Sequence, residues 1–158
     1  LGQLNPDSVI EAITERLDDI ALAAHIAKVD LVLDCSDNFA TRQQINRQCL
    51  RLTTALVSAA AIRWEGQLST YDFRTEHSPC YQCLYPKSNT QEQSCSQNGV
   101  LSPVVGIIGS MQATEAIKAL LNLPTLTGKL MIIDAYTMMI RTLNLKRDPN
   151  CTLCHHKK

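Results

Sequence analysis

The chain has 158 residues, enough for one domain with a hydrophobic core and too few for two, so we expect a single domain over residues 1–158. Its 15 Lys and Arg balance 15 Asp and Glu, which argues against nucleic acid or an anionic membrane as a partner. No apolar stretch reaches the ~20 residues of a membrane span, and no secretory signal is visible. We therefore expect a cytoplasmic protein whose seven cysteines are free thiols or metal ligands rather than disulfides.

The first half of the chain predicts two helices and two or three strands. Residues 9–17 fit a strand or a helix equally well, and Asp18 or Asp19 then caps a helix that reaches about residue 29. The apolar run at residues 30–35 is typical of a strand buried on both faces, and a helix follows from about Asn38. Residues 54–62 predict another buried strand, and residues 66–73 predict a strand that can run antiparallel to it.

The second half predicts a long loop, one helix and one strand. Residues 74–102 show little periodicity, and loops of this length are usually functional. A helix begins at Pro103 with Ser102 as its cap, and its predicted apolar face holds Val104, Ile107, Ile108, Met111 and Ile117. Gly106 and Gly109 destabilise a helix, so we expect close packing there, against a sheet or another chain. Residues 130–134 predict the last strand.

Helices that alternate with buried strands predict an α/β fold, with a Rossmann-like, mostly parallel sheet, flanking helices and antiparallel additions. However, no glycine-rich turn of the kind that binds phosphates lies between any predicted strand and helix. The chain also opens on Leu1 without an initiator Met. We therefore expect a chain that begins within a domain.

Two pairs of cysteines share the spacing C-x-x-C, namely Cys80 with Cys83 and Cys151 with Cys154. Each pair can occupy one edge of a tetrahedral Zn²⁺ site, and four thiolates leave no open position. We therefore predict a structural zinc that joins the mid-chain loop to the C-terminal tail. The alternatives are a redox disulfide within one pair, or unrelated thiols. Cys35 and Cys49 lie in apolar-periodic segments and are predicted to be buried free thiols.

The turn DCSDN, residues 34–38, places two carboxylates after a buried strand. In open α/β sheets, ligands bind at the carboxyl ends of the strands, so Asp34 and Asp37 are candidates to meet Mg²⁺ and phosphate oxygens. The alternative is that Asp37 or Ser36 only caps the following helix. Spacing alone favours neither hypothesis.

Several blocks of the sequence resemble one family, in its order and at close to its spacing. They are LVLDCSDNFATRQQIN, SAAAIRWEGQL, PCYQCLYP, SCSQNGVLSPVVGIIGSMQATEAIK and CTLC, and together they extend over nearly the whole chain. The family is the ThiF/MoeB group of adenylyltransferases, relatives of the ubiquitin-activating enzymes. The resemblance implies ATP-dependent adenylylation of the C-terminal glycine of a ubiquitin-like sulfur-carrier protein, with Mg²⁺, for sulfur transfer in molybdopterin or thiamine biosynthesis.

The resemblance also implies roles for individual residues. Asp37 and Asn38 resemble the family's nucleotide-site pair, with Asp37 assisting Mg²⁺-ATP, and Arg42 either supports that site or braces the fold. The four cysteines of the C-x-x-C pairs match the family's structural zinc ligands. Cys95 matches a position that in some branches forms a thioester or disulfide with the carrier or a sulfur donor, and the alternative is an uninvolved surface thiol.

The implied partners are a carrier of the MoaD or ThiS type ending in Gly-Gly, a sulfur donor such as a cysteine desulfurase, and a second copy of the chain in a homodimer. The segment AAIRWEGQ favours the molybdopterin branch slightly, and its Trp64 belongs either to a groove for the carrier's tail or to the core.

The family's nucleotide loop precedes all these blocks. The chain thus resembles only the C-terminal portion, which by itself should not adenylylate. A non-catalytic zinc-containing module that binds a ubiquitin-like protein, and a redox protein, are the alternative functions.

Overall fold

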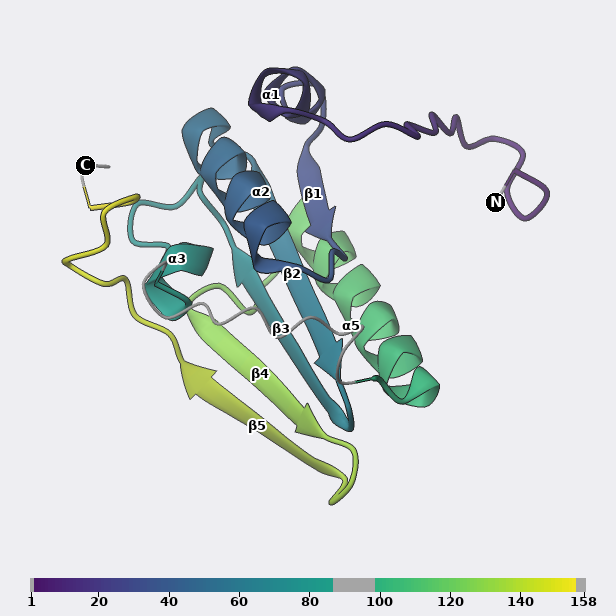
Figure 1. The fold of residues 1–158 in the computed structure, drawn as a ribbon, viewed down its shortest axis with the longest axis vertical. Helices are drawn as coiled ribbons and strands as arrows, with labels where there is room; N and C mark the ends of the chain where they lie inside the picture. The colour runs from purple at the N-terminus through teal and green to yellow at the C-terminus, as the bar shows by residue number, and fades with distance from the viewer. Residues whose placement is uncertain (1, 87–98, 156–158) are drawn as a thin grey trace.

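A mixed sheet of five strands forms the centre of the structure, a computed structural model that describes residues 2–86 and 99–155. The strands follow one another across the sheet in chain order: β1 (Leu31–Asp34), β2 (Ala55–Ile62), β3 (Glu65–Tyr71), β4 (Lys129–Asp134) and β5 (Met139–Asn144) (Figure 1). β1 and β2 are parallel, and the other three neighbouring pairs are antiparallel. The α/β class is confirmed, but the prediction of a mostly parallel sheet is wrong for the described residues.

Connection lengths explain the directions of three of the four neighbouring strand pairs, but not of β3 and β4, which a long connection containing α5 joins. A parallel pair needs a crossover of a dozen or more residues, and α2 (Phe39–Leu52) supplies it between β1 and β2. Only residues 63–64 separate β2 from β3, and only residues 135–138 separate β4 from β5. Both of these pairs are therefore hairpins, which are antiparallel by construction. The antiparallel direction predicted for the strand after residue 65 is confirmed.

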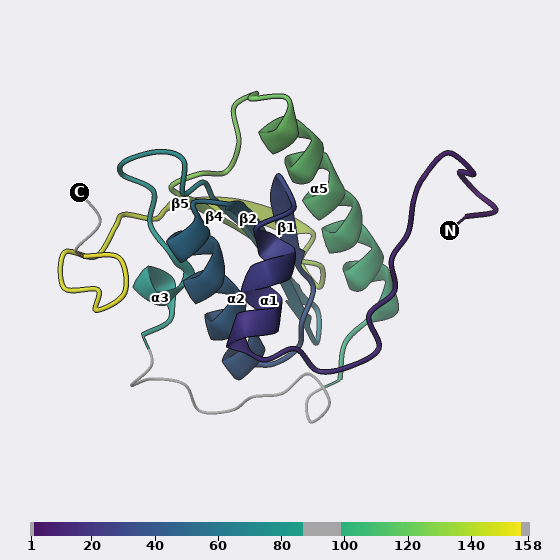
Figure 2. The same cartoon turned by 90° about the horizontal axis from the view of Figure 1, so that it is seen from above.

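Helices cover both faces of the sheet. α2 and the short α3 (Tyr81–Leu84) lie on one face, with α1 (Asp19–Ile26) beside α2, and α5 (Ser102–Leu120) lies on the other (Figure 2). Successive residues of a strand point to opposite faces of its sheet. Leu56 of β2 therefore belongs to the apolar core under α2 and α3, whereas Val57 belongs to the core under α5. Burial on both faces is what the apolar run in this strand predicts.

The predicted N-cap residue is correct for α1 and wrong for α5. The side chain of Asp18 accepts hydrogen bonds from the backbone N–H groups of Ile20 and Ala21, at 3.0 and 2.8 Å, so the predicted cap of α1 is confirmed. In α5, Leu101 occupies the cap position and Ser102 is the first helical residue. The predicted Ser102 cap is wrong, and the backbone N–H groups of this end receive no side-chain cap.

The outer side of α5 is more open than its sequence pattern predicts. Ile108 is buried, but Ile107 and Ile117 are 40% and 58% exposed, so the buried face is narrower than expected. A Cβ atom added at Gly106 or Gly109 would meet nothing within 4 Å among the described residues. Of the two predicted arrangements, close packing of these glycines against the sheet is therefore absent among the described residues, and packing against another chain stays a prediction.

Two buried polar side chains fix α5 to the sheet. Nε2 of Gln112 donates to the backbone oxygens of Asp34 and Val57, both at 3.0 Å, where β1 and β2 lie side by side. One turn later, Oε2 of Glu115 accepts a hydrogen bond of 2.9 Å from the hydroxyl of Thr70 on β3. Because an unpaired buried polar group is costly, these bonds favour one position of the helix on the sheet.

Most of residues 2–18 extend away from the rest of the structure in both ribbon views (Figures 1 and 2), whereas the backbone oxygen of Leu17 accepts a hydrogen bond of 3.3 Å from Nε2 of Gln44 on α2. Residues 9–17 within them form neither the strand nor the helix that their pattern allowed, and Val9 is fully exposed. The long predicted loop, in contrast, contains the short helix α3.

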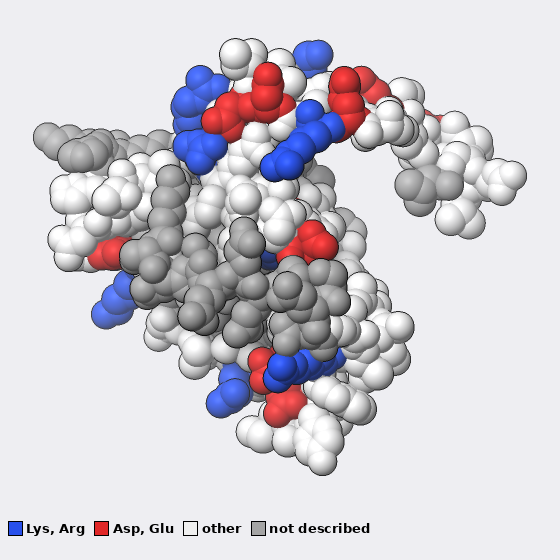
Figure 3. Space-filling view, viewed as in Figure 1, with Lys and Arg blue, Asp and Glu red and all other residues white. Residues whose placement is uncertain are grey.

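Charged side chains of both signs are mixed on the face drawn in Figure 3, where basic and acidic groups lie beside one another around α1. Arg47 of α2 and Asp19 of α1 form one such pair, with 2.9 Å between Nη2 and Oδ2. Mixed charge agrees with the balanced composition. In the part of the chain that the structure describes, no helix has the length and apolar character needed to cross a membrane.

Candidate functional site

The acidic turn after β1 is built around Asp34, which is 1% exposed. Its carboxylate accepts hydrogen bonds from the N–H and hydroxyl groups of Ser36, at 3.0 and 2.6 Å, and from the hydroxyl of Ser58 on β2, at 3.1 Å. These bonds keep the carboxylate inside the protein, so Asp34 shapes the turn. The turn thus offers one carboxylate to a ligand rather than the two that the spacing indicated.

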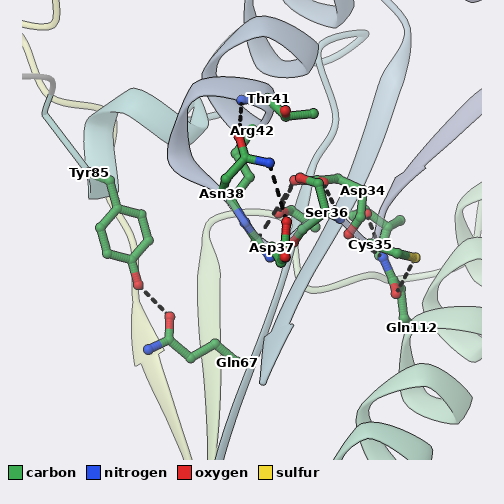
Figure 4. Close-up of polar contacts among 12 residues, drawn as sticks. Asp34, Cys35, Ser36, Asp37, Asn38, Thr41, Arg42, Gln67, Tyr85 and Gln112 are labelled. Atoms are coloured by element: carbon green, nitrogen blue, oxygen red, sulfur yellow. Dashed lines mark hydrogen bonds and ion pairs between the residues drawn. The ribbon is translucent and has the colours of Figure 1, made fainter. Parts of the chain in front are cut away.

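That carboxylate belongs to Asp37, which is exposed and lines a cavity. Asn38 is the N-cap of α2: its Oδ1 accepts from the N–H of Thr41 at 2.8 Å, and its Nδ2 donates to Oδ1 of Asp37 at 3.3 Å (Figure 4). The cap is therefore Asn38 and neither Asp37 nor Ser36. Asn38 holds the Asp37 carboxylate at the start of a helix, where negative charge is stabilised.

Arg42, one turn into α2, is 7% exposed and joins the turn to the cavity. Its guanidinium donates to the backbone oxygen of Ser36 and lies 3.8 Å from Oδ2 of Asp34 (Figure 4). Arg42 therefore braces the turn, and it also lines the same cavity as Asp37. A buried guanidinium at a cavity wall is a fixed positive charge that can attract an anionic group.

A cavity of about 380 Å³, which we call the groove, lies on the face of β2 and β3 that α2 and α3 cover. Its floor consists of three cross-strand pairs: Ser58 with Ser69, Ala60 with Gln67, and Ile62 with Glu65. Arg42 lines the end near Ser58, since both side chains contact Asp34. Small side chains in the SAAAI run of β2 leave space above this floor.

Aromatic side chains form the roof of the groove: Phe39 at the start of α2, Tyr81 in α3, and Tyr85 directly after α3. The ring of Tyr85 meets Phe39 edge-on, with 5.6 Å between centroids, and lies 5.0 Å from that of Tyr81. Its hydroxyl donates to Oε1 of Gln67 on the floor (Figure 4). Tyr85 therefore connects the roof with the floor.

The four cysteines of the C-x-x-C pairs lie together, with all four sulfur atoms within 4.8 Å of one another. The Sγ–Sγ distance is 3.8 Å for Cys80–Cys83, 3.7 Å for Cys80–Cys151 and 3.4 Å for Cys83–Cys154. In a tetrahedral site with Zn–S bonds of about 2.3 Å, neighbouring sulfur atoms lie about 3.8 Å apart. A disulfide requires about 2.05 Å. The cluster thus fits a metal such as zinc, and neither pair is a disulfide in this structure.

Contacts outside the sulfur atoms hold the loop and the tail together. Nε2 of Gln82 donates to the hydroxyl of Thr152 at 2.7 Å, and Arg147 donates to the backbone oxygens of Cys154 and of Glu76. Hydrogen bonding from Cys80 is the main reason that the pKa of the Cys83 thiol is lowered. The hydrogen bonds of Gln82 and Arg147 hold the two C-x-x-C segments in position around the sulfur atoms.

The remaining predicted residues lie elsewhere. Cys49 is buried as predicted, and burial raises its pKa to about 12, but Cys35 is exposed, so the prediction of a buried thiol is wrong there. Trp64 is 47% exposed at the turn between β2 and β3, where its ring meets that of Tyr136 edge-on, so it does not belong to the core. Cys95 lies outside the described residues.

Three polar residues of the site carry little signal in the sequence: Gln67, Tyr85 and Gln112. Gln112 is the easiest to detect, because it is a polar residue one turn after Ile108 on the buried side of α5. Gln67 and Tyr85 lie in ordinary strand and loop patterns, and their contact joins residues 18 positions apart.

The model of the ThiF family matches residues 1–153 of the chain. The chain belongs to the ThiF family. Two relatives from Escherichia coli (strain K12) match 98% of this ThiF-family chain: the sulfur carrier protein ThiS adenylyltransferase, 43% identical over 154 residues, and the molybdopterin-synthase adenylyltransferase, 43% identical over 155 residues. The chain spans 61% and 62% of the lengths of these two proteins.

Solved structures with the ThiF-family fold include E. coli MccB, which superposes with a TM-score of 0.77 at 16% identity. The match covers 97% of this chain and 47% of the MccB chain. At this identity the likeness concerns the fold alone. The α/β arrangement described above is thus also that of an experimentally determined protein.

Proposed function

We propose that the protein to which this ThiF-family chain belongs adenylylates the C-terminal glycine of a ubiquitin-like sulfur-carrier protein. The observation that carries the proposal is the groove, which leads to the Asp37 carboxylate and the Arg42 guanidinium. The names of two relatives that are 43% identical support this activity, since both are adenylyltransferases and one acts on the sulfur carrier ThiS.

The proposed reaction is a substitution at phosphorus. A carboxylate oxygen of the carrier's terminal glycine forms a bond to the α-phosphorus of ATP, the bond from that phosphorus to the bridging oxygen breaks, and pyrophosphate leaves. Catalysis of such a step consists mostly of positioning and of neutralising negative charge. Arg42 supplies fixed positive charge at the groove wall, and Asn38 holds Asp37 in place. Asp37 is the residue that would hold Mg²⁺, which supplies further charge neutralisation when bound.

The groove suits a peptide tail with small side chains. Its floor extends over β2 from Ser58 to Ile62, which corresponds to about four residues of extended chain at ~3.3 Å per residue. The alanines leave room for the main chain of a tail such as Gly-Gly. We place the carboxylate of the tail at the Arg42 end, where a cation attracts it.

We also propose that zinc is the metal of the four-cysteine cluster and that it is structural. Thiolates are preferred ligands of zinc, and four of them leave no coordination position for a substrate. A zinc held there would join α3, on the groove side, to the C-terminal residues of the chain.

The remaining partners are proposals that rest on the same family membership. They are a sulfur donor such as a cysteine desulfurase, and a second copy of the chain in a homodimer. The thiols of the cluster are free in this structure, which suits a reducing cytoplasm.

Pyrophosphate exchange tests the function. The full-length protein is mixed with ATP, labelled pyrophosphate and one purified carrier, of either the MoaD or the ThiS type, and label in ATP is measured. We expect exchange that depends on one of the two carriers, with the MoaD type favoured. Because both relatives match the chain at 43% identity, the assay also decides the branch. Absence of exchange with both would favour a module that binds a ubiquitin-like protein without nucleotide.

Cys95 is proposed to form a covalent link after adenylylation. Its thiolate would attack the carbonyl carbon of the acyl-adenylate, the bond to AMP would break, and a thioester would remain. In a Cys95→Ser variant we expect pyrophosphate exchange within about two-fold of wild type but no thiol-sensitive carrier conjugate on a non-reducing gel. Cys35→Ser is the matched control and should keep the conjugate. A Cys95→Ser variant that passes sulfur onward at the wild-type rate would show that Cys95 is uninvolved.

A further inference from the structure

The middle of the groove has few polar groups available to a peptide. Backbone N–H and C=O groups of β2 and β3 lie in the plane of the sheet and pair with neighbouring strands, so only side chains rise from the floor. The hydroxyl of Ser58 donates to Asp34 at 3.1 Å, and that of Ser69 donates to the backbone oxygen of Lys129 at 2.8 Å. Neither serine therefore directs its proton into the groove.

Gln67 is different, because its side-chain amide reaches up from the floor toward the roof (Figure 4). Its Oε1 accepts from the hydroxyl of Tyr85, and among the described residues its Nε2 has no hydrogen-bond partner. Across the floor stands Ala60, whose methyl group leaves the space beside the amide open. The amide of Gln67 thus offers the centre of the groove a free donor, Nε2, and an acceptor, Oε1, whose present partner can be replaced.

Tyr85 is held in the roof so that its hydroxyl meets this amide. Its ring packs between Phe39 and Tyr81, with centroid distances of 5.6 and 5.0 Å. Burial raises the pKa of Tyr85, so its hydroxyl stays protonated at neutral pH and can donate. Removal of the hydroxyl alone would leave both ring contacts in place.

An extended peptide in the groove would lose water from its backbone amides. Each buried amide group needs a new partner, and leaving one unpaired is costly. We propose that Gln67 and Tyr85 are the positioning residues for an incoming tail: the tail displaces their mutual hydrogen bond, and both side chains then bond to its backbone. This inference rests on the proposed function, and the substrate it requires is an extended peptide with small side chains and a terminal carboxylate.

The test uses Gln67→Met, which keeps the length of the side chain but removes its hydrogen-bonding groups. In carrier-dependent pyrophosphate exchange with the full-length protein, we expect the KM for the carrier to rise roughly ten-fold, which corresponds to one or two lost hydrogen bonds. The KM for ATP and kcat should stay within about two-fold, because in the proposed arrangement this amide bonds to the backbone of the tail and not to the nucleotide or the reacting atoms. Tyr85→Phe should raise the carrier KM by about three-fold, since only one partner is lost.

Controls separate a positioning role from a purely structural one. Gln3→Met makes the same chemical change on the exposed N-terminal segment and should leave the carrier KM unchanged. A Gln67→Met variant with a lower melting temperature but an unchanged carrier KM would show that the pair only braces roof and floor, and would overturn the inference. A lower carrier KM in Tyr85→Phe would also overturn it, because the hydroxyl would then obstruct the tail. Wild-type protein without carrier-dependent exchange would refute the proposed function itself, so the two failures are distinguishable.

Discussion

Replacing Asp37 with Ala in the full-length protein is expected to lower carrier-dependent pyrophosphate exchange by at least about 100-fold, the usual effect of removing one charged or hydrogen-bonding group from a phosphoryl-transfer site. Asp37 is the exposed carboxylate of the turn, whereas the carboxylate of Asp34 is buried and accepts hydrogen bonds from Ser36 and Ser58. No second carboxylate of the turn can therefore take its place.

Two further variants make the Asp37 experiment specific. Asp37→Asn keeps the shape and the contact with Asn38 but loses the charge, so we expect its residual activity to require a higher Mg²⁺ concentration. Asp30→Ala removes an exposed carboxylate before the other end of β1 and should leave activity unchanged. Activity of Asp37→Ala within ten-fold of wild type, at equal zinc content, would remove Asp37 from the site.

Replacing Cys151 with Ser should destabilise the protein by about 3 to 5 kcal/mol and abolish stoichiometric zinc binding. Cys151 is 3% exposed, and its sulfur lies 3.7 Å from that of Cys80, so the serine variant loses one ligand from a buried cluster. Because metal binding to such a site contributes directly to folding, the loss appears as a lower melting temperature. Zinc content by atomic absorption and thermal melting by circular dichroism measure the two effects.

Chelation provides an independent check on the same cluster. Excess chelator should lower the melting temperature of the wild-type protein toward that of Cys151→Ser and leave the variant nearly unchanged. Cys35→Ser is the matched control, because Cys35 is exposed and lies outside the cluster. If Cys151→Ser melts at the wild-type temperature and retains one zinc per chain, the cluster is not the metal site.

Local signals in the sequence predicted the parts of the structure that depend on neighbouring residues. Asp18 caps α1 because its side chain reaches backbone groups two and three residues ahead. The C-x-x-C spacing predicted the cysteine cluster, although its two halves lie 71 residues apart, because each half is a local motif of known geometry. The apolar run of β2 likewise predicted a strand buried on both faces.

The features that the sequence did not predict depend on contacts between residues far apart in the chain. Asp34 and Asp37 are the same residue type in one turn, and what separates them is Ser58, 24 residues away, which helps to bury the first carboxylate. An apolar run cannot distinguish a parallel strand from a central antiparallel one. Connection lengths account for the directions of β1 with β2 and of the two hairpins, but not for the antiparallel pair of β3 and β4. The contact between Gln67 and Tyr85 exists only because α3 lies over β3, which no local pattern specifies.

The residues around α3 point alternately to the cysteine cluster and to the groove. Cys80 and Cys83 turn their sulfur atoms toward the cluster, while Tyr81, Leu84 and Tyr85 line the groove. Residues 80–85 thus join the cysteine cluster to the groove, and neither can shift without moving the other. In the proposed function the metal and the tail are then thermodynamically linked: a metal that orders this segment strengthens binding of the tail, and by reciprocity a bound tail strengthens binding of the metal by the same factor.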